Sequence, residues 1–534
     1  MLIPTYPIHR ISHRTSHRIF DKSNHIPHPQ CLQLSHRTDL PSTRSQSRTP
    51  SLCSSQVFGL QTHTPHRWDP DHLRTRFVQA LSEMYRTEVP LYGKLVDVVN
   101  QVDTTTLQSR GQSLNDLPSR FQLERHGAIR LGTQQEMRMI SRLFAVMGMF
   151  PVGYYDLKMV GFPLHGTAFR PQTEESLRKN PFRVFTTVLR PDLISSPEVR
   201  EMATSILSTR QLFSSRLIEL IDQAETSALA NLTAEDANNL ITESLKIFKW
   251  HSRSSVPLET YLTLKKEHPM VADIVCFPSA HINHLTPRTL DIDAVQAGMI
   301  SQGLPAKDRI EGPPKRKCEI LLRQTSFKAL EERVTFAGDA DHAVDGTHTA
   351  RFGEVEQRGA AVTRKGRELY DALLAKAVGR SEKEDKDSDK VLKEVFAEYP
   401  DDWEVLRKEG LVYFRYRVAE DKAPVAGARK LEGSVHMDRL LKEGVVTCEP
   451  ITYEDFLPFS AAGIFTSNLG GEKDGGTERK LQKTEEESKR SRVQLEGLLG
   501  RKIPSEIDLY DELQTDSVKE CQALLGLSEI VLGA

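Results

Sequence analysis

The sequence lacks the features that mark membrane proteins, zinc ribbons and nucleic-acid-binding proteins. It contains no run of about 18 uncharged apolar residues, so we expect no membrane-spanning segment. Its six cysteines include no Cys-x-x-Cys pair, which argues against a zinc ribbon or a dense disulfide framework and favours reduced thiols inside the cell. The formal net charge of −2 argues against general binding to nucleic acid, which requires a basic surface.

Acidic residues are nearly absent from residues 1–68, where only Asp21 and Asp39 occur among many Ser, Arg, His and Pro residues. Such a segment cannot bury enough apolar surface to build a core, so we predict a disordered extension. An Arg-rich, Ser-rich and acid-poor leader is also typical of an organellar transit peptide. A non-structural extension or a wrongly assigned start is the alternative. We therefore expect a soluble intracellular protein, in the cytoplasm or the mitochondrial matrix.

The remainder, residues 69–534, is predicted to form one mixed α/β domain. Apolar residues at helical spacing begin near Asp69, and the pattern is broken at Pro90. Short apolar runs separated by Gly and Pro over 126–185 are typical of an α/β arrangement. Two strongly charged stretches are predicted to be exposed insertions near residues 381–390 and 469–492.

A long helical region and then a strand-rich region follow along the chain. Residues 196–250 have a helical pattern, whereas 271–370 are rich in β-branched or alternating residues. The apolar segment "VADIVCF" (271–277) is predicted to be one of these strands. The order of helices and strands therefore indicates a mixed α/β protein.

The segment "FPSAHINHLTPRTLDID" (277–293) contains two histidines three residues apart, His281 and His284. Pro287 and the β-branched residues nearby argue against a helix here. In a strand only residues at even offsets share a face, so at most one of the two histidines would face a site. The spacing does not decide which one.

Two other segments offer side chains that suit the same kind of site. If "LERHGAIRLGT" (123–133) is a strand, His126 and Arg130 share one face. In "HTARFGEVEQRGAAVTRKG" (348–366), the alternation puts both glutamates and Arg358 on one face. That face is either an exposed row of ion pairs or a buried one that needs a cation. Two histidines and one carboxylate from separate strands are typical of non-haem Fe(II) oxygenases, although the same ligands also bind zinc.

The amino-acid sequences of six segments resemble those of the 2-oxoadipate dioxygenase/decarboxylase family. The resemblance covers about residues 72 to 515, and it implies a vicinal-oxygen-chelate-like curved β-sheet that holds a metal and is wrapped by additional helices. Residues 69–534 would then be the catalytic domain. The segments are "RHGAIRLGT", "NPFRVFTTVLR" (180–190), "HINHLTPRTLDID", "LLRQTSFKALEE" (321–332), "FGEVEQRGAAVT" and "ITYEDFLPFSAAGIF" (451–465).

The resemblance implies the ligands of an Fe(2+) ion. They are His126 in "RHGAIR", His284 in "HINHLTPR" and Glu356 in "EVEQRG". His281 would face away if the strand is regular. Glu354 remains the alternative carboxylate, because parity along a strand does not separate it from Glu356.

The resemblance also implies residues that bind substrate. Arg130 matches the arginine that holds a substrate carboxylate, a role that suits a planar guanidinium. Phe459 and Ser460 match the family's other substrate contact. Phe459 stands where the family usually has a small aliphatic residue, so the preferred chain length of the diacid is in question. Asn283 and Thr286 are candidates for orienting the metal ligands.

The activity implied by the resemblance is the Fe(II)-dependent conversion of 2-oxoadipate and O2 into 2-hydroxyglutarate and CO2, in lysine catabolism. The expected partners are a small-molecule 2-oxo dicarboxylic acid and O2, without nucleic acid or membrane. Two alternatives are a zinc-dependent hydrolase or lyase on the same scaffold, and a non-catalytic interaction protein with a vestigial metal pocket. Dependence on O2 separates the enzymes, since a hydrolase does not consume it.

Overall fold

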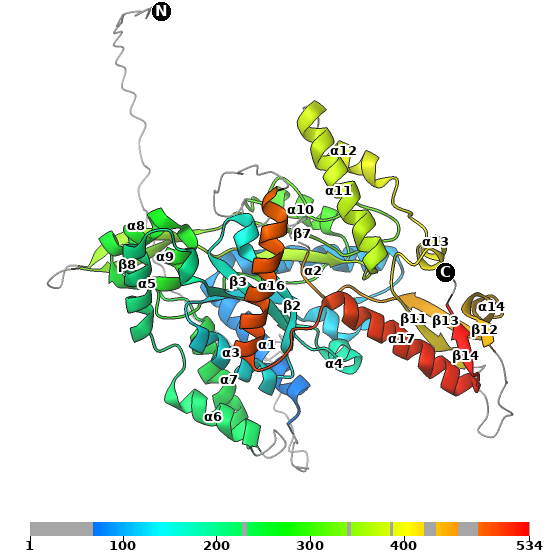
Figure 1. Ribbon diagram of the computed structural model, residues 1–534, viewed down its shortest axis with the longest axis horizontal. Helices are drawn as coiled ribbons and strands as arrows, with labels where there is room; N and C mark the ends of the chain where they lie inside the picture. Colours follow the sequence, from blue (N-terminus) through cyan, green and yellow to red (C-terminus); the bar gives the residue numbers. More distant parts are fainter. Residues whose placement is uncertain are drawn as a thin grey trace, which may run out of the picture. The chain divides into compact units, whose positions relative to one another are not determined.

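Helices and strands are interspersed along the chain, which confirms the predicted mixed α/β class (Figure 1). The computed structural model describes residues 68–226, 232–338, 343–384, 388–420, 434–457 and 479–532. The described residues belong to one unit, Thr64–Ala534. The predicted extension, apart from Trp68, lies outside them, and the predicted division into extension and catalytic domain stays a prediction. None of the described helices is both long enough and apolar enough to cross a membrane.

The largest sheet has five strands in the order β2-β3-β4-β1-β6. β1 (His126–Leu131) runs parallel to β4 (Arg183–Leu189) and antiparallel to β6 (Leu285–Thr286). β2 (Phe150–Asp156) and β3 (Leu164–Arg170) extend the sheet on the other side of β4 by antiparallel pairing. Every residue of β3 and β4 is buried, as expected for strands covered on both faces. β1 is therefore an interior strand with fixed neighbours.

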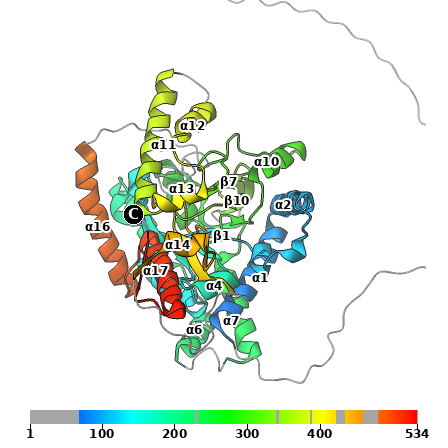
Figure 2. The same ribbon diagram turned by 90° about the vertical axis from the view of Figure 1, so that its right-hand side faces the viewer.

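Helices from the first half of the chain cover this sheet. α1 (Pro70–Glu88) and α2 (Pro90–Ser109) meet at the predicted break, and Pro90 is the first residue of α2, where its missing N–H costs nothing. α1 packs against α7 (Ala234–Phe248), with the rings of Phe77 and Phe248 5.4 Å apart. Figure 2 shows α2 beside α10 (Ile292–Ser301). The other helices here are α3 (Gln134–Val146), α4 (Glu174–Lys179), α5 (Pro197–Thr209) and α6 (Ser215–Thr226).

The helical region predicted over 196–250 is confirmed as α5, α6 and α7, but the strand predicted at 271–277 is wrong. Residues 271–275 of that segment lie in α9 (Pro269–Val275), which follows α8 (Leu258–Glu267). Residues 270–275 are all buried and, apart from Asp273, apolar, so their sequence carries no clear periodicity that separates a buried helix from a buried strand. Pro269 at the helix start was the local signal for a helix.

A second sheet meets the first beside β6. β10 (Glu354–Arg358) pairs with β7 (Leu322–Ser326). A parallel bridge between Arg288 and Glu356 links β10 to the chain that leaves β6, and the Glu356 N–H donates to Pro287 O at 3.1 Å. β1 and β10 therefore lie on either side of β6. A third sheet consists of β5 (Arg253–Pro257), β8 (Glu331–Ala337) and β9 (Val344–Thr349).

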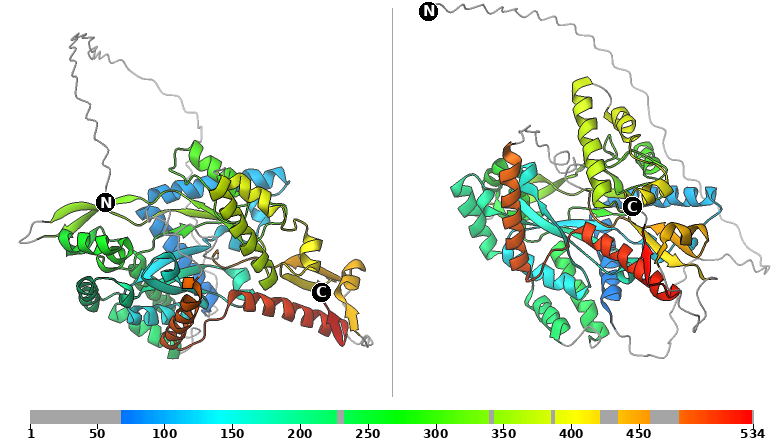
Figure 3. Two further views of the ribbon diagram at one scale, coloured as in Figure 1. Left: turned by 45° about the horizontal axis from the view of Figure 1, so that its top comes forward. Right: turned by 45° about the vertical axis from the view of Figure 1, so that its right-hand side comes forward.

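The last third of the chain builds a separate apolar core around a small sheet. α17 (Glu506–Leu525) packs against β11 (Phe414–Val418), as Figure 3 shows in red and yellow-orange. The predicted insertion at 381–390 falls where α11 and α12 meet, and 385–387 lie outside the described residues. The second stretch predicted to be an insertion, 469–492, forms the first part of α16 from residue 479 onward. The remaining elements are α11 (Arg364–Glu384), α12 (Ser388–Phe396), α13 (Trp403–Lys408), β12 (Ser434–His436), α14 (Met437–Lys442), β13 (Val446–Pro450), α16 (Arg479–Leu499) and β14 (Glu529–Val531).

Candidate metal centre

The first residue of β1, His126, is fixed by strand pairing on both sides. It is opposite Arg183 of β4 and Thr286 of β6. Its imidazole is almost fully buried, and the ring of Phe456 lies edge-on to it at 4.9 Å. Backbone pairing therefore sets the position of His126 before any ligand binds.

His284 reaches the same place from the segment that precedes β6. Residues 281–284 form no regular strand, so the parity argument for choosing between His281 and His284 does not apply there. The ring of His284 lies 5.3 Å from that of His126 and stacks on Phe352 at 4.6 Å. Its Nδ1 atom is buried without a hydrogen-bond partner. The segment thus delivers His284 to the metal centre with an unused polar atom.

Two glutamates of β10 approach His126 from the other sheet. Both are buried, and both lie on one face of the strand, as predicted. His126 Nε2 lies 2.7 Å from Glu354 Oε1, and His126 Nδ1 lies 3.0 Å from Glu356 Oε2. Each nitrogen of one imidazole therefore faces a different carboxylate.

Of the two carboxylates, Glu354 is the one that lies close to both histidines, whereas Glu356, the ligand that the family resemblance implies, is bound by arginines. One ligand atom each of His126, His284 and Glu354 lies within 4.8 Å of the others. Glu356 instead accepts from Arg358 Nε at 2.6 Å and from Arg183 Nη2 at 3.1 Å. Two guanidinium groups compete with a metal for that carboxylate, whereas Glu354 has no such pairing with arginine among the described residues.

The protonation states of this cluster suit a cation. Burial lowers the pKa of His284 to about 3, so its imidazole is neutral at pH 7. Burial by itself raises the pKa of Glu354, but the hydrogen bond with His126 and the nearby histidines lower that pKa to about 2. Neutral imidazole and ionised carboxylate are the forms that ligate metals. The buried, unpaired Nδ1 of His284 and this donor set together fit a divalent transition metal.

Thr286, one of the two residues expected to orient the ligands, contacts two of the candidate ligands with its side chain. The Thr286 hydroxyl lies 3.0 Å from His126 Nε2 and 3.3 Å from Glu354 Oε1. The backbone of Asn283 is tied to β1, since its N–H donates to Ala128 O at 3.0 Å. These contacts anchor the segment that carries His284.

Arg130, the predicted substrate-binding residue, lies four residues along β1 from His126. Its Nη1 donates to Asp273 Oδ2 at 2.6 Å. Arg130 also lines a cavity of about 260 Å³ together with Lys265, Asp273 and His348. His281 contacts Asp273 and not the metal centre, with Nε2 3.1 Å from Oδ1.

Phe459 and Ser460, the other predicted substrate contacts, lie outside the described residues. The nearby Phe456 is described, and its ring contacts His126 as well as the guanidinium of Arg183, 4.3 Å from the ring centre. The roles expected for Phe459 and Ser460 stay predictions.

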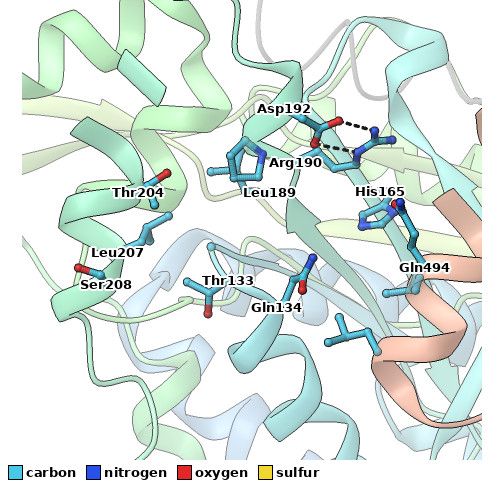
Figure 4. Close-up of a pocket in the computed structure, with 14 residues that line it drawn as sticks. Thr133, Gln134, His165, Leu189, Arg190, Asp192, Thr204, Leu207, Ser208 and Gln494 are labelled. Atoms are coloured by element: carbon cyan, nitrogen blue, oxygen red, sulfur yellow. Dashed lines mark hydrogen bonds and ion pairs between the residues drawn. The ribbon is translucent and has the colours of Figure 1, made fainter. Parts of the chain in front are cut away.

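A larger cavity, of about 320 Å³, lies elsewhere, between β4, α3, α5 and α16 (Figure 4). Arg190 and Asp192 in its wall form a two-pronged ion pair, with Arg190 Nε 3.2 Å from Asp192 Oδ1. His165 in the same wall contacts the Tyr154 hydroxyl at 3.2 Å. Arg190 and Asp192 thus neutralise each other's charge. The described residues that line this cavity include no cluster of histidines and carboxylates like that of the candidate metal centre.

Sequence reasoning missed three residues near the site: Asp273, His348 and Arg183. Asp273 lies in the segment 271–277, for which the sequence predicts a strand, and its position in α9 brings it to Arg130. The contact of Arg358 with Glu356, by contrast, could have been predicted from the sequence. Arg358 is two residues from Glu356 and shares its strand face. His348 and Arg183 offered no local signal, since their partners are distant in sequence.

A comparison with known families identifies the family of the chain. The model of the 2-oxoadipate dioxygenase/decarboxylase family matches residues 77–468. This chain belongs to that family. Relatives named 2-oxoadipate dioxygenase/decarboxylase from Pseudomonas putida and Escherichia coli are each 46% identical to it, over 86% and 85% of this chain and 98% of each relative. A relative of the same name from Mycobacterium tuberculosis is 36% identical over 84% of this chain and 97% of its own length.

Solved structures of the family share the fold. The crystal structure of the hydroxyglutarate synthase in complex with 2-oxoadipate from Pseudomonas putida matches with a TM-score of 0.73 and 42% identity, covering 86% of this chain and 99% of that chain. An uncharacterized protein from Shigella flexneri matches with a TM-score of 0.72 and 42% identity, over 85% and 100% of the two chains. Family membership confirms the resemblance that the sequence motifs carried.

Proposed function

We propose that this chain is a metal-dependent enzyme that converts 2-oxoadipate and O2 into 2-hydroxyglutarate and CO2. The reaction balances, because the six carbons of the substrate become a five-carbon hydroxy acid and CO2, and both atoms of O2 enter the products. The convergence of His126, His284 and Glu354 in a member of this family carries the proposal.

The metal is proposed to be Fe(II), held by His126, His284 and Glu354. Two imidazoles and one carboxylate are a ligand set that suits Fe(II), and the ion would supply the binding of the 2-oxo acid and the activation of O2. Glu356 would then act on the ligand His126: by accepting the Nδ1–H it would leave the Nε2 lone pair free to bind the metal beside Glu354. Arg183 and Arg358 hold Glu356 in that role.

The protein's own groups orient the substrate and exclude water. Arg130 is proposed to bind a carboxylate of the substrate, and so to set which end of the molecule meets the metal. A guanidinium left without its anion in a dry site is costly, which disfavours 2-oxo acids that lack the second carboxylate. Phe352 and Phe456 pack on the two ligand imidazoles and limit access of water to them.

The direct test is an oxygen-electrode assay of the metal-free protein supplied with Fe(II) and 2-oxoadipate. We expect O2 uptake, CO2 release and 2-hydroxyglutarate formation in a 1:1:1 ratio, and no reaction under argon or with Zn(II) in place of Fe(II). Product formation without O2 would support the zinc hydrolase or lyase alternative. Absence of thermal stabilisation by Fe(II) would support a vestigial pocket, because a ligand that binds the folded state must stabilise it.

A further inference from the structure

A second buried cluster lies beside Arg130, outside the metal centre. It consists of Asp273 of α9, His281 and His348, with one ligand atom of each within 4.8 Å of the others. Asp273 Oδ1 lies 3.1 Å from His281 Nε2 and 2.9 Å from His348 Nε2. Its other oxygen, Oδ2, accepts from Arg130 Nη1 at 2.6 Å. One carboxylate therefore joins two imidazoles to the proposed substrate anchor.

We propose that Asp273 is a positioning residue for Arg130, and that it thereby sets the preference of the enzyme for 2-oxo diacids over 2-oxo monoacids. The inference rests on the proposed function, since it concerns the carboxylate that Arg130 binds. Asp273 itself touches neither substrate nor metal in this role.

The hydrogen-bond pattern is complete around an ionised Asp273. Burial would raise the pKa of this carboxyl, but Arg130, His281 and the hydrogen bonds with both histidines hold it well below its usual range. Burial lowers the pKa of His281, so that its imidazole is neutral and can donate Nε2–H. The Tyr261 hydroxyl, 3.0 Å from His348 Nδ1, can donate to that atom and leave the His348 proton on Nε2. Asp273 then accepts three hydrogen bonds, and both of its oxygens are used.

Aromatic packing holds the two imidazoles in place. The indole of Trp250 lies edge-on to His281 at 4.8 Å and parallel to His348 at 6.1 Å. Phe277 contacts both imidazoles, at 5.6 Å and 4.7 Å. Asp273 belongs to a helix whose residues 270–275 are all buried, so it has little freedom to move. Because Asp273 and its two histidines are held this rigidly, the guanidinium of Arg130 is fixed in place before its anion binds. This lowers the entropy cost of binding.

The guanidinium keeps donors for a ligand. Within the described part of the chain, Asp273 is the one hydrogen-bond partner of the Arg130 side chain, through Nη1. The cavity that Arg130 lines contains a second cation, Lys265, and no carboxylate other than Asp273 among its lining residues. An incoming carboxylate therefore meets the Arg130 edge that Asp273 leaves unused.

A second metal ion is the competing interpretation of the same three side chains. In that case a divalent cation would bind Asp273 Oδ1 while Arg130 binds Oδ2. The single negative charge of Asp273 would then face three positive charges. The hydrogen bonds already satisfy His348 and Asp273 without an ion. Charge balance therefore favours positioning over metal binding.

The test compares two substrates in the Fe(II)-loaded enzyme. Asp273→Asn keeps the size of the side chain and removes its charge. We expect the KM for 2-oxoadipate to rise about tenfold or more, with kcat within about threefold, and the KM for the monoacid 2-oxohexanoate to stay unchanged. Equal losses with both substrates, or an unchanged KM for 2-oxoadipate, would overturn the proposal. Asp192→Asn, which breaks the Arg190 pair at the separate cavity of Figure 4, is the matched control and should leave both KM values unchanged.

Two further measurements separate this proposal from its premises. The affinity for adipate, measured by calorimetry, reports on binding without turnover. We expect this affinity to fall about tenfold in Asp273→Asn and by a smaller factor in His348→Gln. The second variant serves as the test if Asp273→Asn fails to fold. If Arg130→Lys leaves the KM for 2-oxoadipate unchanged, the anchor role of Arg130 is wrong; if only Asp273→Asn is silent, the positioning role alone is wrong. Two iron or zinc ions per chain, one of them lost in Asp273→Asn, would establish the metal interpretation instead.

Discussion

At the scale of single residues, the two glutamates of β10 differ by their neighbours and not by their position on the strand. Both point to one face, both are buried, and both contact His126. Glu356 has two arginines within hydrogen-bonding distance, so its charge is already balanced without a metal. Strand alternation places both carboxylates on this face but does not tell them apart. The difference comes from Arg183, which pairs with Glu356 and lies on a different strand, β4.

Exchange of each glutamate for glutamine separates the two roles. We expect Glu354→Gln to lower bound iron to a small fraction of the parent level and to abolish O2 uptake, because a neutral amide is a poor ligand. Glu356→Gln should retain bound iron with an affinity lowered about tenfold to a hundredfold, as for residues that orient a ligand. Iron content after gel filtration and O2 uptake measure both. Full iron retention in Glu354→Gln would return the ligand role to Glu356.

The two histidines of the 281–284 segment should also separate cleanly. His284→Ala removes a proposed ligand, so we expect loss of 2-oxoadipate-dependent O2 uptake and of bound iron. His281→Ala leaves the metal centre intact and removes one donor to Asp273, so iron content and partial activity should remain. Atomic absorption and an oxygen electrode report both quantities. The reverse pattern would refute the ligand assignment.

At the scale of elements, β1 and the chain before β6 are packed so closely that a side chain at Gly127 would force its neighbours to shift. A Cβ at Gly127 would lie 2.6 Å from Ile282 Cδ1 and 3.0 Å from the backbone oxygen of His284. The lack of a side chain at Gly127 thus lets the 281–286 segment reach the metal centre.

Gly127→Ala tests this contact. We expect the added methyl group to push the segment outward, to weaken iron binding and to lower stability by about 1–3 kcal/mol, as for overpacked cores. Iron titration and thermal melting measure the two effects. Gly379→Ala in α11 is the control, because nothing lies within 4 Å of its Cβ and alanine favours a helix. Unchanged iron affinity in Gly127→Ala would show that the segment adapts.

What the sequence predicted at this scale follows from periodicity. The helices on either side of Pro90 and those within 196–250 have polar and apolar faces, and they were predicted correctly. Residues 271–277 are apolar except for Asp273, so the pattern favours a buried strand as much as a buried helix, and residues 271–275 form a helix in the structure. The pairing of β10 with β7, and the bridge from Glu356 to Arg288, depend on contacts distant in sequence that no local pattern encodes.

At the scale of the whole molecule, buried neutral histidines make stability depend on pH. Burial lowers the pKa of His165 to about 4, with Arg190 contributing, from an ordinary value of 6.5. The unfolded chain therefore binds a proton before the folded protein does. Stability is fully present above pH 6.5 and is lost as the pH falls toward 4, by about 1.4 kcal/mol per pH unit for each such histidine.

Replacing His165 should make the protein less sensitive to acid. We expect the fall in melting temperature between pH 7 and pH 5 to be smaller in His165→Gln than in the parent, equivalent to about 2 kcal/mol. Differential scanning calorimetry at pH 7, 6 and 5 measures the difference. His72→Gln, at a mostly exposed position, is the control. Parallel curves for the parent and His165→Gln would mean that His165 takes up its proton in the folded state.

One strand carries both ends of the proposed site, since His126 and Arg130 lie four residues apart on β1, between parallel β4 and antiparallel β6. Side chains alternate along a strand, so a slip of β1 by a single residue would turn both groups to the opposite side of the sheet at once. The proposed metal ligand and the proposed substrate anchor would therefore be displaced together by such a slip, so the pairing of β1 with β4 and β6 fixes both functions at once.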